Sequence, residues 1–155
     1  MVFLHCPYQV DGFRLLKCLD DIVKLFLNNG SSVNMRNEDE STALTLAALE
    51  GHFSIAQILL ESGADMELQD YEGNTALINS ARMDYPDIVS ILLVRGAHED
   101  VTNSSGENAL QFAKKYGSFS AIKMFAAWHD TELRKEMLFE ASHEGKTRLV
   151  RGLLC

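Results

Sequence analysis

The side chains that most often carry out chemistry are scattered along this sequence. No two histidines form the His-x-x-x-His pair that places zinc ligands on one helical face, and no Cys-x-x-Cys pair is present. The five histidines are His5, His52, His98, His129 and His143. The sequence therefore predicts no metal site.

A hydrolytic triad could be composed from His98, Asp100 and Ser104 or Ser105. These residues lie in a single link, with no pocket and no device to bind an oxyanion. The glycine-rich loops that bind phosphate groups are also absent from the sequence. We therefore predict that the chain is not an enzyme and uses no cofactor.

The charge of the chain is concentrated in its middle. The net charge is −8, and residues 37–110 contain fourteen Asp or Glu side chains against only Arg82 and Arg95. Such a segment repels nucleic-acid phosphates, so the sequence predicts no nucleic-acid partner. A basic segment of another protein is the better partner.

Cysteine usage and hydropathy indicate the compartment. Cys6, Cys18 and Cys155 form an odd set without close pairs, which is typical of free thiols in a reducing compartment. No run of 18 apolar residues is present, so no membrane span is predicted. We expect an intracellular monomer, cytoplasmic or nuclear, since no strongly basic cluster decides between these locations.

The elements that position these side chains repeat along the chain. Thr42-Ala43-Leu44 recurs as Thr75-Ala76-Leu77 and as Asn108-Ala109-Leu110, each time after 33 residues. This period is typical of a stacked-repeat solenoid, whose extended surface favours binding over catalysis. The sequence predicts one domain over residues 1–155, with units at about 4–36, 37–69, 70–102, 103–129 and 130–155.

Each unit is predicted to contain a turn, a helix, a second turn and a second helix. Gly51 ends the first helix of its unit, in a position that favours positive φ. In the next unit Asp84, which tolerates the same conformation, replaces this glycine, and Pro86 stands where the second helix begins.

The first and last units depart from this pattern. In the first unit, one helix is predicted to contain Phe13, Leu15, Leu16 and Leu19, and a second helix to contain residues 22–27. In the last unit, Asp130 is predicted to cap a longer helix from Thr131, and residues 149–154 to form a final helix. Trp128 is expected to fill the gap at this irregular junction, with a binding anchor as the alternative.

These features resemble the ankyrin repeat. The matching residues include Asp70, Gly73, Thr75, Leu77, Ala81, Ile88, Val89, Leu92, Leu93, Gly96 and Ala97, with Thr42, Leu44, Ala47, Ala48, Gly51, His52, Ile55, Leu59, Leu60, Gly63, Ala64 and Asp65. The resemblance implies an all-α ankyrin-repeat solenoid of stacked helix-turn-helix units with short hairpin-like turns. The histidine of the family's first helix is replaced by Thr45, Ile78 and Gln111. We therefore expect the family's Thr–His hydrogen-bond network to be absent.

The resemblance also implies where a partner would bind, at the turn tips and at the exposed ends of the first helices. The tip positions are Glu38, Asp39, Ser41, Tyr71, Glu72, Asn74, Ser104, Ser105 and Glu107. The helix-end positions are Leu49, Glu50, Arg82, Met83, Lys115 and Tyr116. The apolar and aromatic members are typical of binding hot spots, although single exposed apolar residues are ordinary on any surface. The carboxylates could steer a basic partner or simply keep the surface solvated.

Three functions remain open at this point. The first is a non-catalytic interaction module, an adaptor or scaffold that binds a basic or mixed-charge segment. The second is a stand-alone inhibitor that masks an enzyme or a transcription factor. The third is a regulatory fragment of a larger enzyme or channel.

Overall fold

The computed structural model describes residues 12–144, and this part contains helices and no strand. The helices are α1 (Gly12–Asn28), α2 (Ala43–Glu50), α3 (Phe53–Glu61), α4 (Ala76–Arg82), α5 (Pro86–Val94), α6 (Ala109–Tyr116), α7 (Phe119–His129) and α8 (Thr131–Glu144). The predicted all-α fold is confirmed. None of the helices described is long and apolar enough to cross a membrane.

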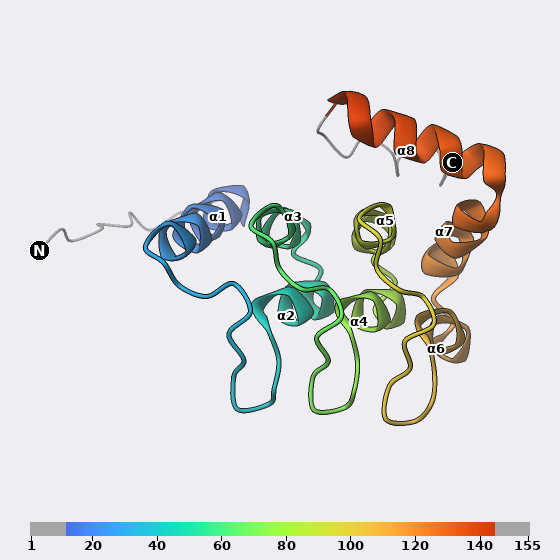
Figure 1. The fold of residues 1–155 in the computed structure, drawn as a ribbon, viewed down its shortest axis with the longest axis horizontal. Coiled ribbons are helices and arrows are strands. Elements are labelled where there is room, and N and C mark those ends of the chain that lie inside the picture. Colours follow the sequence, from blue (N-terminus) through green and yellow to red (C-terminus); the bar gives the residue numbers. More distant parts are fainter. Residues whose placement is uncertain (1–11, 145–155) are drawn as a thin grey trace, which may run out of the picture.

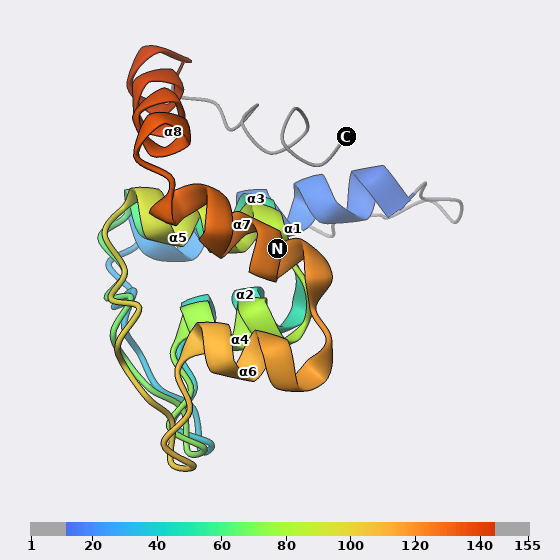
Figure 2. The ribbon, with the colours of Figure 1, turned by 90° about the vertical axis from the view of Figure 1, so that its right-hand side faces the viewer.

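The helices form two layers. In the inner layer α4 packs between α2 and α6, and in the outer layer α1, α3, α5 and α7 follow one another (Figure 1). Three long loops project from the stack, and they superimpose when the molecule is viewed along it (Figure 2). We call these loops finger 1 (residues 34–42), finger 2 (67–75) and finger 3 (100–108). Leu44, Leu77 and Leu92 lie in the core between the layers, which is the burial that such short helices require.

The prediction of two helices in the first unit is wrong. Residues 12–28 form the single helix α1, which packs in the outer layer against α3. The position of Gly51 corresponds, 33 residues earlier, to Cys18, so no glycine is available to end a first helix there. As a result no inner helix precedes α2 within residues 12–144. Leu46 of α2 is therefore 41% exposed, whereas the equivalent Asn79 and Phe112 are 2% and 6% exposed.

The C-terminal helix α8 begins at Thr131, as predicted. The Asp130 carboxylate caps it by accepting hydrogen bonds from the N–H groups of Glu132 (3.0 Å) and Leu133 (3.3 Å). However, α8 packs on α7 and α5 above the outer layer (Figures 1 and 2). It does not occupy the place beside α6 that the inner helix of a further unit would take. The final helix predicted at residues 149–154 lies outside the described residues.

The ends of the inner helices follow the predicted turn chemistry. Gly51 and Gly117 end α2 and α6 with φ of 76° and 71°, and Asp84 adopts φ of 59° after α4. Asp84 has a second role that the sequence did not indicate. Its Oδ1 accepts a hydrogen bond of 2.8 Å from the N–H of Ala121, in the first turn of α7. This carboxylate therefore ties two neighbouring units together.

Within residues 12–144, two non-glycine residues have positive φ, and substitution of each by glycine is expected to change stability in opposite directions. Glu40 in finger 1 (φ 56°) makes only an exposed ion pair with Arg36, so Glu40→Gly should raise the free energy of unfolding by about 0.5–1 kcal/mol. Asp84→Gly removes the charged acceptor of the Ala121 N–H and should lower it by about 1–2 kcal/mol. Urea denaturation measures both changes. Shifts in the same direction would contradict this assignment.

Other side chains take the place of the family's Thr–His pair at two of the three inner helices. In α2 the Thr42 N–H donates to Thr45 Oγ1 (2.8 Å) and the Thr45 N–H donates back to Thr42 Oγ1 (3.2 Å). Asn108 and Gln111 make the same exchange at the start of α6. Ile78 cannot return the hydrogen bond in α4, so Thr75 accepts only from its backbone. Thr45 and Gln111 thus replace the family histidine as capping partners.

Candidate functional site

The three fingers are built by one repeated interaction. The residues Asn37, Asp70 and Asn103 stand 33 residues apart, and the Oδ1 atom of each accepts two backbone N–H groups of its own finger at 2.9–3.0 Å. Asx side chains of this kind hold a turn in a single conformation. The fingers are therefore defined structures with the same shape.

Neighbouring fingers are also joined to each other. The N–H of Tyr71 donates to the carbonyl of Asp39 (3.1 Å), and the N–H of Ser104 donates to the carbonyl of Glu72 (3.0 Å). Between fingers 2 and 3, Asn103 Nδ2 also donates to Asn74 Oδ1 (3.1 Å). These bonds fix the spacing of the tips, so the three fingers present one continuous surface.

Most of the predicted binding residues are accessible on this surface. The exposed residues are Glu38, Asp39, Glu50, Tyr71, Glu72, Met83, Ser104, Ser105, Lys115 and Tyr116, and the half-buried residues are Ser41, Leu49, Arg82 and Glu107. Asn74 is the exception. It is buried, because its side chain bridges Glu72 and Asn103, so its predicted place at an accessible tip is wrong.

The structure brings six of these residues together around one hollow. The hollow has a volume of about 310 Å³ and lies where finger 3 meets the ends of α4 and α6. Its lining contains Glu72, Arg82, Ser104, Ser105, Lys115 and Tyr116, together with Asn103 and Phe112. The sequence indicated Phe112 only as a core residue, because the helical pattern does not show that its ring also borders the hollow.

Two aromatic rings and two cations form one wall of this hollow. The rings of Phe112 and Tyr116 meet edge to face, with centroids 4.8 Å apart. The Arg82 guanidinium lies 5.9 Å from the Phe112 centroid and 5.4 Å from the Tyr116 centroid. Lys115 lies at 5.8 Å and 6.0 Å from the same two rings. At these distances the faces of the rings attract both cations.

Two predicted binding carboxylates, Glu72 of finger 2 and Glu107 of finger 3, lie beside cations of the inner-helix ends. Lys115 Nζ donates to both oxygens of Glu107 at 2.9 and 3.0 Å, and this hydrogen bond raises the pKa of Lys115. Arg82 lies 3.8 Å from Glu72. The hydroxyl of Tyr71 donates to Glu72 (3.1 Å), which raises the pKa of Tyr71.

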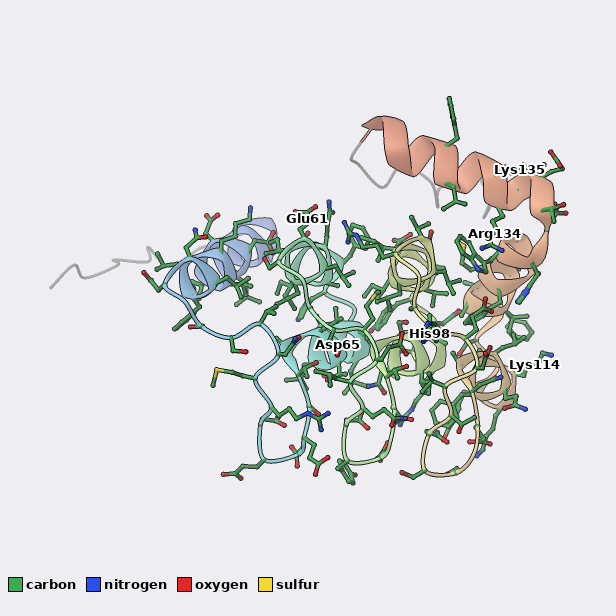
Figure 3. The ribbon with its side chains drawn as sticks, viewed as in Figure 1. Glu61, Asp65, His98, Lys114, Arg134 and Lys135 are labelled. Carbon is green, nitrogen blue, oxygen red and sulfur yellow. The ribbon has the colours of Figure 1, made fainter. Side chains whose placement is uncertain are left out.

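The charge of the surface therefore changes along the stack. At finger 1 the carboxylates of Glu38 and Asp39 have no ion-pair partner among the residues described. At finger 3 the carboxylate of Glu107 is neutralised, and Lys114 adds a further cation on α6 (Figure 3). Of the four carboxylates expected to provide a negative field, Glu38 and Asp39 thus remain without an ion-pair partner among the described residues, whereas Glu72 and Glu107 lie beside cations.

The structure gives the triad hypothesis no support. The His98 ring approaches Glu67 at 3.8 Å, on the link where His98 is labelled in Figure 3, and none of its contacts joins it to Ser104 or Ser105. Within residues 12–144, no group of three or more His, Cys, Asp or Glu side chains could hold a metal ion.

Comparison with known proteins agrees with the repeat pattern. A family model described as "Ankyrin repeats (3 copies)" matches residues 15–103, which is more than half of the chain. A comparison with curated proteins gave no match.

Proposed function

Because this chain belongs to the ankyrin repeat family, we propose that it is an adaptor or scaffold that binds a partner through its fingers and inner-helix ends. Ankyrin repeats are generally protein–protein interaction modules. The partner-binding surface would contain the predicted residues other than the buried Asn74.

One observation carries this proposal. Tyr71, Met83 and Tyr116 are exposed large apolar or aromatic side chains, and all three lie on the surface of fingers and inner-helix ends. Tyr71 is 68% exposed, so the core does not require a tyrosine at the tip of finger 2. Aromatic side chains on a rigid scaffold are typical binding hot spots, because they bury a large area while losing few rotamers.

The charges support a partner segment of mixed charge. The unpaired Glu38 and Asp39 favour basic side chains at finger 1. Glu72 and Glu107 already lie beside Arg82 and Lys115, so they attract basic side chains of a partner less strongly. A partner that is basic along its whole length would match only part of the surface.

Affinity capture from a cell lysate tests the proposal. The double variant Tyr71→Ala, Tyr116→Ala is expected to lose at least about tenfold of the specifically retained protein, since each ring is a candidate hot spot. The matched control is Leu25→Ala, Phe119→Ala, which removes two exposed apolar side chains from the outer layer. Circular dichroism checks that both variants are folded. Equal retention by both variants would disprove binding through the fingers.

A further inference from the structure

The guanidinium of Arg82 has no hydrogen-bond partner among residues 12–144. Its closest carboxylate oxygen, on Glu72, is 3.8 Å away, which exceeds hydrogen-bond distance. Among the residues described, no other acceptor contacts its side chain. The backbone beneath it is held in place, because the Arg82 carbonyl accepts a hydrogen bond from the Ser118 hydroxyl at 2.9 Å.

The carboxylates near Arg82 are bound to other donors. One oxygen of Glu72 accepts from the Tyr71 hydroxyl (3.1 Å), and the other accepts from Asn74 Nδ2 (2.9 Å). Both oxygens of Glu107 accept from Lys115. Neither carboxylate is therefore positioned to satisfy the guanidinium.

The surroundings of Arg82 favour a planar anion. The guanidinium lies against the rings of Phe112 and Tyr116, where fewer water molecules can solvate it and each charged hydrogen bond is stronger. The hydroxyls of Ser104 and Ser105 line the same hollow and donate to no acceptor within the described part of the chain. Guanidinium and hydroxyl donors beside an aromatic wall match the geometry of a carboxylate, which arginine binds through two parallel hydrogen bonds.

We propose that this hollow binds a carboxylate side chain, from an Asp or Glu of the partner segment, against Arg82. This inference rests on the proposed function and specifies the chemistry of the partner at one point of the surface. A phosphoryl group carries more negative charge and would lie beside the Glu72 carboxylate in this hollow, so repulsion favours the carboxylate side chain.

Selection of random peptides displayed on phage tests this inference without a known partner. Peptides selected on the wild-type protein are expected to share an Asp or Glu. Arg82→Gln should weaken their binding about tenfold or more. Arg95→Gln is the matched control and should have little effect. The Arg95 guanidinium lies 3.9 Å from Glu61 and its side chain is 32% exposed, whereas the Arg82 guanidinium lies 3.8 Å from Glu72 and its side chain is 34% exposed. Arg95 follows the outer helix α5, so it lies away from the hollow.

A double-mutant cycle identifies the contact itself. Replacing the shared acid of the peptide with its amide should weaken binding to the wild type and cause no further loss with Arg82→Gln. Tighter binding of a peptide with phosphoserine in place of the acid would overturn the preference for a carboxylate. Selected peptides without an acid, or an unchanged affinity of Arg82→Gln, would overturn the whole inference.

The same peptides separate this inference from the proposed function. Peptides that lose affinity on Tyr71→Ala, Tyr116→Ala but bind Arg82→Gln normally would leave the proposed function intact and remove the carboxylate site. Peptides that are indifferent to all three substitutions, or a selection that yields no peptides, would count against both.

Discussion

Replacing Trp128 with alanine is expected to lower the free energy of unfolding by about 3–5 kcal/mol. Trp128 lies in α7 and belongs to the hydrophobic core. The guanidinium of Arg134, labelled in Figure 3, lies 4.6 Å from the ring centroid, so Trp128 also connects α7 to α8. Its removal would leave a large cavity at the place where the helices leave the two-layer stack. Urea denaturation followed by circular dichroism measures the change.

Phe119→Ala provides the control for this prediction. Phe119 lies in the same helix but is 75% exposed, whereas Trp128 is 8% exposed, so the control should change stability by less than about 0.5 kcal/mol. Trp128 is the only tryptophan of the chain, so its fluorescence reports on the α7–α8 junction during unfolding of the wild type. A loss below about 1 kcal/mol for Trp128→Ala would contradict its role in packing and favour the alternative of a binding anchor.

Replacing Gly73 with alanine is expected to destabilise the protein by about 2–3 kcal/mol. Gly73 has φ of 79°, which costs a residue with a Cβ about 1–2 kcal/mol. A Cβ here would also lie 2.6 Å from the backbone nitrogen of Ser104. That nitrogen donates the hydrogen bond to the Glu72 carbonyl that joins fingers 2 and 3, and loss of this bond adds about 1 kcal/mol. Thermal or urea denaturation measures the total.

Gly63→Ala separates the cost of a positive φ from the cost of the contact with Ser104. Gly63 has a similar φ of 81°, but a Cβ there would meet nothing within 4 Å, so only the backbone cost of about 1–2 kcal/mol applies. The excess loss in Gly73→Ala measures the contact between the fingers. Because Ser104 lines the hollow beside Arg82, Gly73→Ala should also weaken binding of acidic peptides, whereas Gly63→Ala should not. Equal losses of stability in the two variants would refute a close contact between the fingers.

Local features of the sequence were sufficient to predict the central units. Gly51, Asp84 and Gly117 adopt positive φ at the ends of the inner helices. Whether a residue tolerates positive φ depends mainly on its own side chain, so these helix ends can be predicted locally. The first unit has no such residue at the equivalent position, which explains why the prediction of two helices there was wrong. The equivalent residue Cys18 lacks that freedom, and the helix continues through it. The absence of a glycine at position 18 was visible in the sequence and favoured one helix over two.

The candidate site was predicted less completely, because its contacts join different units. The period placed Tyr71, Arg82 and Tyr116 on the surface of fingers and helix ends. It did not show that Arg82 lies over the ring of Tyr116, or that Glu72 binds Tyr71 and Asn74. The burial of Asn74 depends on its hydrogen bond to Asn103, 29 residues away in the sequence.

The sequence by itself determined the repeat, the order of its helices and the positions of its turns, because each depends on residues within a few places of one another. Only the tertiary structure decided the hollow at Arg82, the pairing of Glu72 and Glu107 with cations and the position of α8. These features depend on which side chains of neighbouring units meet, as Asp84 meets the N–H of Ala121, 37 residues later. A repeat period fixes which units are neighbours, but the hydrogen bonds between them depend on the individual side chains that the stack brings together.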